Sequence, residues 1–335
     1  MIKRLKLIFF LGFVLLNPQL QAIGPYKPQI ANPVPEPWRW TNFPEYDTIR
    51  ISCVVKGEDG GMWMGIGNKA VYYDGYKTIP FIPDSTEIQS LIFEKDNNLL
   101  VATSKGIFRY KEGEFRKILN FSFNSQRNFL TDSNKDSWIG SDFGLIRITT
   151  KAIYCLNPQG YFEITENGSV VNTVRLELAN DYRISSVQEI KFPVYNLDIN
   201  QLQRIWMVVD LPGKNIATID LKGLPNNLPV WKFMKAPALS VIDISGISEN
   251  RNSVWVTSSN ANIMLLQYLI SEDKWKSINL KDLGGDNVQT SMLKSTDGTI
   301  WIGGHSKLYS LTSAGWKVYQ YPAVTLPLSY IEIYQ

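Results

Sequence analysis

Short apolar segments separated by turns rich in Asp, Gly and Asn recur along most of the chain. Each repeat begins with a largely apolar strand, passes through such a turn into a short strand that contains a tryptophan, and ends with a third strand. Asp, Gly and Asn supply the backbone freedom that a tight hairpin needs, so each repeat is predicted to form a small antiparallel sheet. The anchor position of successive repeats is held by Trp63, Leu100, Trp138, Trp206, Trp255 and Trp301.

The spacing of these anchors indicates the architecture. Successive anchors lie 37, 38, 68, 49 and 46 residues apart, and a fourth, amphipathic strand follows in several repeats. A period of about 40–50 residues with four strands per unit is typical of β-propeller blades. We therefore predict an all-β fold, a β-propeller of four-stranded blades with six full blades. The interval of 68 residues is too long for one blade, so we place an insertion at about 164–190.

The ends of the repeat region suggest a further blade. Residues 38–43 resemble a fourth strand, and residues 328–334 resemble a first strand. Together they predict a composite or incomplete seventh blade that joins the two ends of the ring. Because this blade lacks a second and a third strand, we favour the hypothesis that the chain is a truncated part of a longer protein.

The first 22 residues are predicted to be a signal peptide. Lys3, Arg4 and Lys6 precede an apolar run of ten residues at 7–16, and a polar stretch then leads to Ala22. Charged, apolar and small-residue segments in this order are typical of secretion signals, and ten apolar residues are short for a membrane-spanning helix. We expect a Pro-rich lead at 23–37 and the propeller at 38–335. The mature chain is expected to be periplasmic or secreted, with no membrane span.

Composition excludes several functions. The chain has 34 Lys and Arg against 31 Asp and Glu, and the excess comes from the three basic residues of the signal peptide. A neutral mature chain is not expected to bind nucleic acid, which attracts basic surfaces. One His and two Cys provide no recognisable metal or haem ligand set, so we expect no cofactor. Cys53 and Cys155 are expected to be two separate buried thiols.

Three segments carry a family resemblance. The stretches DGGMWMG, KDSWIGSDFGLIRI and TDGTIWIGGHSKLY resemble the two-component regulator propeller repeat, and the resemblance covers about 45–334. In that family, such repeats build the periplasmic sensor region of hybrid histidine kinases that respond to oligosaccharides. The resemblance implies a sensor that recognises an oligosaccharide and acts through a homodimer or a signalling partner. It also implies membrane and kinase regions, and we expect the chain to be truncated before them.

The chain shows no readable catalytic constellation, so we expect that it is not an enzyme. His305 is the single imidazole and stands in a predicted turn, where a solvated histidine is the simpler interpretation. The turns between first and second strands contain carboxylates, and such turns recur for backbone reasons. Two alternatives stay open: a propeller polysaccharide lyase or glycosidase with its site at the channel mouth, and a protein-binding scaffold.

One end of the ring is the candidate binding surface. Because strands alternate in direction, the turns between second and third strands all face the same mouth of the central channel. Four of these six turns carry a lysine, and a ring of lysines would concentrate anions. We predict that this mouth binds an acidic oligosaccharide, with Phe143 as a stacking platform. The predicted ligand-binding residues are Asn68, Lys69, Lys105, Asp142, Phe143, Lys214, Asn262, His305 and Lys307.

Overall fold

All of the described residues belong to one compact unit of the chain, residues 42–335. The computed structural model describes residues 51–320 except 122, 124–127, 177–183, 201, 225, 238–243, 251, 259–263, 280–288, 296, 305–306 and 313. The predicted signal peptide, the Pro-rich lead and both segments of the composite seventh blade lie outside the described residues. Among the described residues, no helix combines the length and the apolar character needed to cross a lipid bilayer.

The first half of the described chain forms three antiparallel sheets. The first sheet contains β1 (Ile51–Lys56), β2 (Met62–Ile66), β3 (Lys69–Tyr73) and β4 (Thr78–Phe81). The second sheet contains β5 (Ile88–Phe93), β6 (Leu99–Thr103), β7 (Gly106–Lys111) and β8 (Glu114–Leu119). The third sheet contains β9 (Phe129–Thr131), β10 (Ser137–Ser141), β11 (Gly144–Ile148), β12 (Ile153–Asn157), β13 (Gly160–Ile164) and β14 (Val170–Leu176).

Three more sheets complete the described part of the chain. The fourth contains β15 (Val194–Ile199), β16 (Arg204–Leu211), β17 (Lys214–Asp220) and β18 (Lys232–Met234). The fifth contains β19 (Ile244–Asn250), β20 (Ser253–Ser258), β21 (Met264–Leu269) and β22 (Lys274–Asn279). The sixth contains β23 (Gln289–Lys294), β24 (Ile300–Gly304), β25 (Lys307–Thr312) and β26 (Gly315–Gln320). A short 3-10 helix, η3 (Val187–Glu189), lies between β14 and β15.

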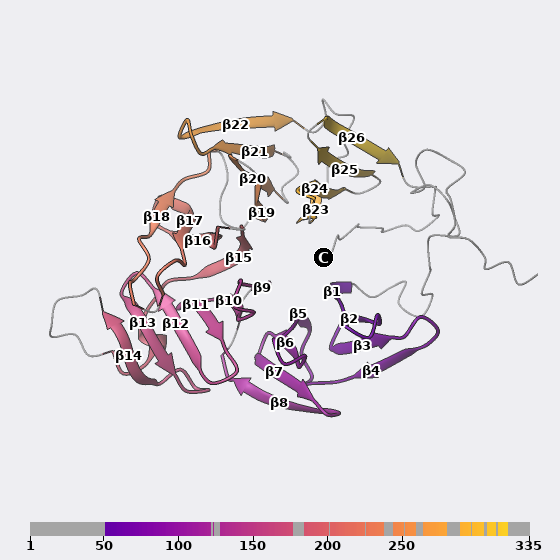
Figure 1. Ribbon diagram of the computed structural model, residues 1–335, viewed down its shortest axis with the longest axis vertical. Coiled ribbons are helices and arrows are strands. Elements are labelled where there is room, and N and C mark those ends of the chain that lie inside the picture. The colour runs from indigo at the N-terminus through magenta and orange to yellow at the C-terminus, as the bar shows by residue number, and fades with distance from the viewer. Residues whose placement is uncertain are drawn as a thin grey trace, which may run out of the picture. The chain divides into compact units, whose positions relative to one another are not determined.

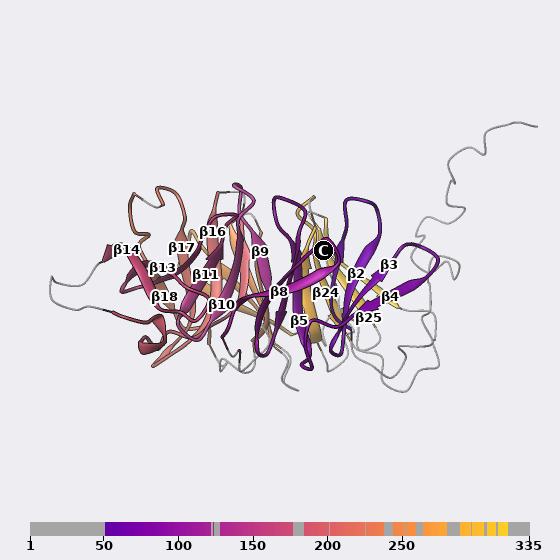
Figure 2. The same cartoon turned by 90° about the horizontal axis from the view of Figure 1, so that it is seen from below.

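The six sheets are arranged around a common centre as a six-bladed β-propeller, which confirms the predicted fold class (Figure 1). The first strand of each sheet lies nearest the centre, and each of these inner strands contacts the inner strand of the next sheet from β1 to β23. Within every sheet, strands that are consecutive in sequence pair antiparallel. Figure 2 shows the ring edge-on, with turns at both of its faces. Because consecutive strands run in opposite directions, the described turns between second and third strands lie at one face, which we call the mouth.

The anchor residues fill the space between neighbouring sheets, as the sequence predicts. Trp63 lies 5.3 Å from the ring of Tyr110 in the second sheet, and Trp255 lies 5.9 Å from the ring of Trp316 in the sixth. Leu100, which replaces tryptophan in the second sheet, is fully buried. The hydrophobic residues form several clusters between adjacent sheets instead of one central core. Apolar contacts between each sheet and its neighbours therefore hold the propeller together.

The turns between first and second strands share one conformation. The same turn position has a positive φ in five sheets, and Gly occupies it in two of them. The five residues are Gly60, Asn97, Lys135, Gln203 and Gly298, and their φ values are 86°, 63°, 66°, 63° and 82°. Left-handed backbone favours Gly and Asn, which explains why these residue types recur in the repeats.

The third sheet departs from the four-stranded prediction. It has six strands, because β13 pairs with the outer edge of β12 and β14 pairs in turn with β13. The described part of the predicted insertion at 164–190 holds β14 and η3. Ser186 caps η3 by accepting a hydrogen bond from the Gln188 amide. Part of the extra length of this repeat therefore forms two additional strands at the outer edge of the third blade.

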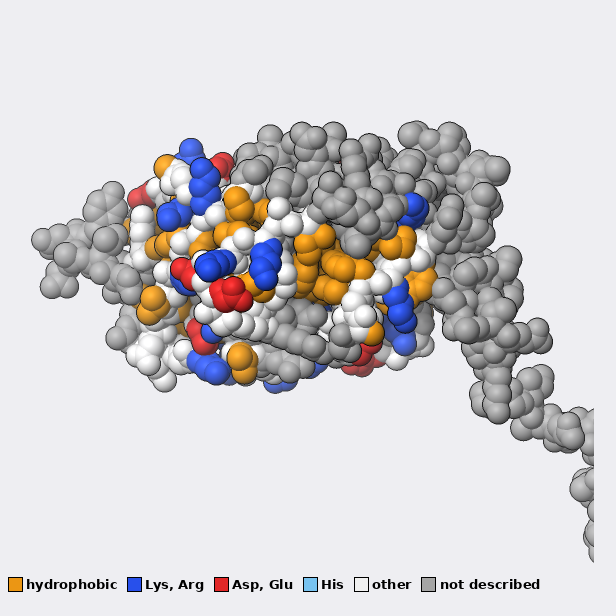
Figure 3. Space-filling view, turned by 90° about the horizontal axis from the view of Figure 1, so that it is seen from above, with side chains coloured by type: hydrophobic (Ala, Val, Ile, Leu, Met, Phe, Trp, Pro, Cys, Tyr) orange, Lys and Arg blue, Asp and Glu red, His pale blue; other side chains and the backbone are white. Residues whose placement is uncertain are grey.

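The outer strands of the fifth and sixth sheets carry both apolar and basic side chains. On the side of the ring that carries β22 and β26, hydrophobic side chains gather between groups of Lys and Arg (Figure 3). Trp275 and Trp316 on these strands are half-buried, and Val318 is exposed. Cys53 and Cys155 are both buried and are not joined by a disulfide, as expected from the sequence. Burial raises the pKa of the Cys155 thiol to about 12.

Candidate functional site

The predicted site residues that the structure describes all lie at the mouth. Asn68 lies in the turn between β2 and β3, Lys105 directly precedes β7, and Asp142 with Phe143 connects β10 to β11. The remaining described lysines begin a third strand; they are Lys69 on β3, Lys214 on β17 and Lys307 on β25. Asn262 and His305, which the sequence also places in these turns, lie outside the described residues.

Backbone hydrogen bonds fix the turns of the mouth against the link to the next sheet. The Ile88 amide donates to the carbonyl of Gly67 at 2.8 Å, and the Phe192 amide donates to the carbonyl of Asp142 at 3.0 Å. Phe143 is half-buried, and its ring meets Phe121 edge-on at 5.2 Å. Much of the predicted stacking surface is therefore already engaged with the core.

The carboxylates of the opposite face have structural partners. In the first three sheets, the residue that pairs with the anchor on the third strand binds a carboxylate near the first turn. Tyr72 donates to Asp59 at 2.6 Å, and Arg109 donates to both oxygens of Glu94 at 2.6 Å. The hydrogen bond from Tyr72, with a smaller contribution from the Gly61 amide, holds the pKa of Asp59 below its ordinary value. These bonds tie a turn to a strand of the same sheet.

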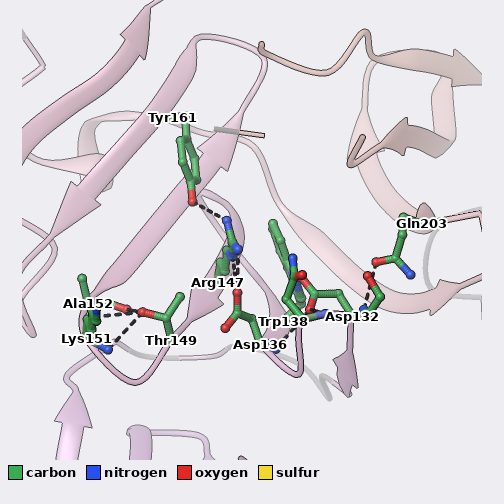
Figure 4. Close-up of polar contacts among 11 residues, drawn as sticks. Asp132, Asp136, Trp138, Arg147, Thr149, Lys151, Ala152, Tyr161 and Gln203 are labelled. Atoms are coloured by element: carbon green, nitrogen blue, oxygen red, sulfur yellow. Dashed lines mark hydrogen bonds and ion pairs between the residues drawn. The ribbon is translucent and has the colours of Figure 1, made fainter. Parts of the chain in front are cut away.

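The third sheet has the most developed of these contacts (Figure 4). Arg147 donates to Asp136 through Nε at 3.0 Å and Nη2 at 2.5 Å, and through Nη1 to the Tyr161 hydroxyl at 3.0 Å. The guanidinium also lies over the Trp138 ring, 5.5 Å from its centre. Burial raises the pKa of Tyr161 to about 12, so its hydroxyl stays protonated. The Trp138 indole N–H donates to Asp132 Oδ2 at 2.9 Å.

A cavity of about 250 Å³ opens beside this group, between the third and fourth sheets. We call it the crevice. Gln203, from the first turn of the fourth sheet, spans the gap and accepts a hydrogen bond from the Ser133 amide at 3.0 Å (Figure 4). The crevice is lined by Asp132, Ser133, Asn134, Trp138, Arg147, Gln203, Leu221, Lys222, Gly223 and Leu224.

A second polar group joins the inner strands of three sheets. Lys294 on β23 lies 3.3 Å from Asp198 on β15 and donates to the carbonyl of Glu249 on β19 at 2.9 Å. Asp198 also accepts from the Glu249 amide at 2.8 Å and the Ser248 hydroxyl at 3.2 Å. Trp206 donates its indole N–H to Glu249. Burial raises the pKa of Asp198, against the opposing effects of Lys294 and the hydrogen bonds. We call this set the channel cluster.

Sequence reasoning missed both the crevice and the channel cluster. Ser133 and Gln203 are 70 residues apart, and Asp198 and Lys294 are 96 residues apart. One available signal was Asp198 itself, because the corresponding inner-strand positions Val55, Ile92 and Leu130 are apolar. A charged residue at a position that other repeats reserve for apolar side chains predicts a partner elsewhere.

Comparison with known proteins identifies the fold of this chain but does not identify an activity. No protein-family model and no curated protein matches the chain. Virginiamycin B lyase from Staphylococcus aureus is 15% identical, with a TM-score of 0.58 over 85% of this chain and 87% of that chain. A streptogramin B lyase is 14% identical, with a TM-score of 0.55 over 82% of this chain and 85% of that chain. At these identities the likeness shows a shared propeller fold alone.

Other solved structures that match include extracellular domains of putative hybrid two component systems from B. thetaiotaomicron. One is 11% identical, with a TM-score of 0.32 over 86% of this chain and 50% of that chain. Another is 15% identical, with a TM-score of 0.30 over 81% of this chain and 45% of that chain. The chain spans about half the length of these extracellular domains.

Proposed function

We propose that the chain is an exported ligand-sensing propeller that binds an acidic oligosaccharide at the mouth and acts through a signalling partner or a second copy. The resemblance of its repeats to the two-component regulator propeller supports the sensing role. The observation that carries the proposal is the lysine rim: Lys69, Lys105, Lys214 and Lys307, from four different sheets, stand at or directly before the start of a third strand, at one face.

The lysine rim supplies a reason for anion binding in a chain of neutral net charge. Lys105 and Lys214 are exposed, and neither they nor Lys69 form an ion pair with another described residue. Cations that converge on one opening concentrate anions there, and the attraction falls as salt is added. A flexible acidic chain can contact several lysines at once, whereas a neutral one gains nothing from them.

The test is to replace the four rim lysines by alanine and to measure the affinity for uronate-containing oligosaccharides by calorimetry. We expect the quadruple variant to bind at least about tenfold more weakly, because several charge-assisted contacts are lost. The matched control replaces four exposed lysines elsewhere, Lys56, Lys95, Lys135 and Lys276, and should keep its affinity. Equal affinity of the rim variant and the wild type would reject the proposal.

A propeller lyase is the second candidate, and the channel cluster is the observation that favours it. Asp198 and Lys294 stand on inner strands with about one fifth of each side chain exposed, 21% and 23%. A carboxylate and an amine in contact can move a proton in an elimination reaction. Incubation with uronate polysaccharides, followed by the absorbance of the unsaturated product, tests this. Turnover by the wild type that is lost in Asp198→Asn would favour the lyase over the sensor.

A further inference from the structure

The crevice lies at the face opposite the mouth and is built by an irregular loop. Its walls come from the turn Asp132–Asn134 of the third sheet and from Leu221–Leu224, which follow β17. The connection from β17 to β18 covers residues 221–231, whereas that from β7 to β8 covers only 112–113. The added residues curl back onto the first turn of their own sheet, where the Leu221 amide donates to the Gln203 carbonyl at 2.8 Å. The loop thereby closes one side of a cavity.

The Asp132 carboxylate and the Gln203 amide oxygen, which line the crevice, already accept hydrogen bonds. Asp132 Oδ1 accepts from the amides of Asn134 and Asp136 at 2.8 and 3.0 Å, and Oδ2 accepts from the indole of Trp138. Gln203 Oε1 accepts from the Ser133 amide. The carboxylate and this amide oxygen are therefore committed to holding the turn, and they offer little to a ligand.

Several donors around the crevice remain available. A guanidinium has five N–H groups, and three of those of Arg147 are used by Asp136 and Tyr161, which leaves two. Gln203 Nε2 has no acceptor among the described residues, and the exposed Lys222 has no ion pair among them. Leu224 and the Trp138 ring add apolar surface. A cavity whose one carboxylate and glutamine oxygen are occupied, and whose cationic and amide donors are free, selects a ligand rich in acceptor oxygens.

We propose that the crevice binds the carboxylate of a small organic acid, of about the size of one sugar acid. The carboxylate accepts from Lys222, Gln203 Nε2 and the free edge of Arg147, since charge-assisted bonds of this kind are the strongest available here. The cavity of about 250 Å³ lies just below the range of typical ligand sites, which limits the occupant to a small molecule. This site is separate from the lysine rim and does not rest on the function proposed for it.

Calorimetric titration with D-glucuronate, D-glucose and inorganic phosphate tests the proposal. We expect D-glucuronate to bind more tightly than D-glucose, which lacks the carboxylate, and more tightly than phosphate. Lys222→Gln should raise the dissociation constant for D-glucuronate about tenfold. Leu224→Trp, which fills the cavity, should abolish binding, while its thermal unfolding shows whether the fold is kept.

Two controls separate this site from its surroundings and from the mouth. Lys135→Gln removes an exposed charge from the same turn outside the cavity lining and should leave D-glucuronate binding unchanged. The quadruple alanine variant of the lysine rim should still bind D-glucuronate, and the loss of this binding would assign it to the mouth. Equal binding of glucose, tighter binding of phosphate, or wild-type affinity in Lys222→Gln would overturn the proposal.

Discussion

At the scale of single residues, the propeller uses hydrogen bonds from third strands to hold its first turns. Tyr72, Arg109 and Arg147 stand at equivalent places beside their anchors, and each donates to a carboxylate of its own sheet. The corresponding residue of the sixth sheet is Ser310, whose buried hydroxyl has no hydrogen-bond partner among the described residues. The same backbone design is therefore supported by different side chains in different blades.

The contact between Tyr72 and Asp59 leads to a titration prediction. The hydrogen bond from Tyr72 is the main cause of the lowered pKa of Asp59. Because the folded pKa lies below the ordinary value of 3.8, this contact stabilises the fold above about pH 3.8, and the effect is lost as the pH falls through the folded pKa. In Tyr72→Phe, we expect the pKa of Asp59 to rise toward 3.8.

The measurement is a carboxyl-carbon NMR titration of Asp59 in the wild type and the variant. Tyr73→Phe is the matched control, because the Tyr73 hydroxyl donates to the carbonyl of Gly75 instead. This variant should leave the Asp59 titration in place. An unchanged Asp59 pKa in Tyr72→Phe would show that the backbone amide, and not the phenol, sets its value.

At the scale of the elements, the inner strands differ in what binds them to one another. Between the third and fourth sheets, the Asn128 side chain accepts from the Leu197 amide at 2.8 Å and donates to its carbonyl at 2.9 Å, in the manner of a strand pair. Between the fourth, fifth and sixth sheets, the channel cluster takes this role. Apolar positions of the inner strands were predictable from the repeats, whereas these polar links were not, since each needs a partner from another sheet.

The raised pKa of Asp198 predicts how the channel cluster responds to pH. A carboxylic acid whose folded pKa lies above its unfolded value contributes most to stability below the unfolded pKa, and this contribution is lost as the pH rises through the folded pKa. Asn keeps the shape of Asp198 without titrating. The unfolding free energy of Asp198→Asn, relative to that of the wild type, should therefore improve from about pH 4.5 to about pH 7.

Urea denaturation of both proteins at the two pH values checks this prediction. Asp210→Asn, at an exposed position of the same sheet, should show no such change in relative stability. A variant whose relative stability falls with rising pH would mean that the ion pair with Lys294 outweighs the burial of Asp198.

At the scale of the whole molecule, the ring depends on how closely neighbouring sheets approach. Gly140 on β10 faces the backbone of β15, and a β-carbon at Gly140 would lie 2.3 Å from the Val194 carbonyl oxygen and 2.8 Å from that of Tyr195. Backbone cannot move aside as a flexible side chain can. The glycine that follows Trp63, Trp138 and Trp301 by two positions thus has a packing reason in the third sheet.

Gly140→Ala should therefore lower the unfolding free energy by about 1–3 kcal/mol, the usual cost of forcing extra volume into a packed interior. Chemical denaturation of the full chain measures it. Gly57→Ala is the matched control, because its added methyl group would meet chiefly the Asp59 side chain, which can move. A loss in Gly140→Ala no larger than that in Gly57→Ala would contradict the close approach of the two sheets.

The sequence by itself determined the strands, the tryptophan anchors and the propeller class, because alternation and turn residues act over a few neighbouring positions. It also placed the lysines of the rim at one face, since consecutive antiparallel strands alternate in direction and every turn between a second and a third strand then lies at the same end. Only the tertiary structure decided that Lys294 meets Asp198 across 96 residues, and that the loop at Leu221–Leu224 closes a cavity over Trp138. Such contacts form between sheets, and their partners are set by how the blades pack around the axis.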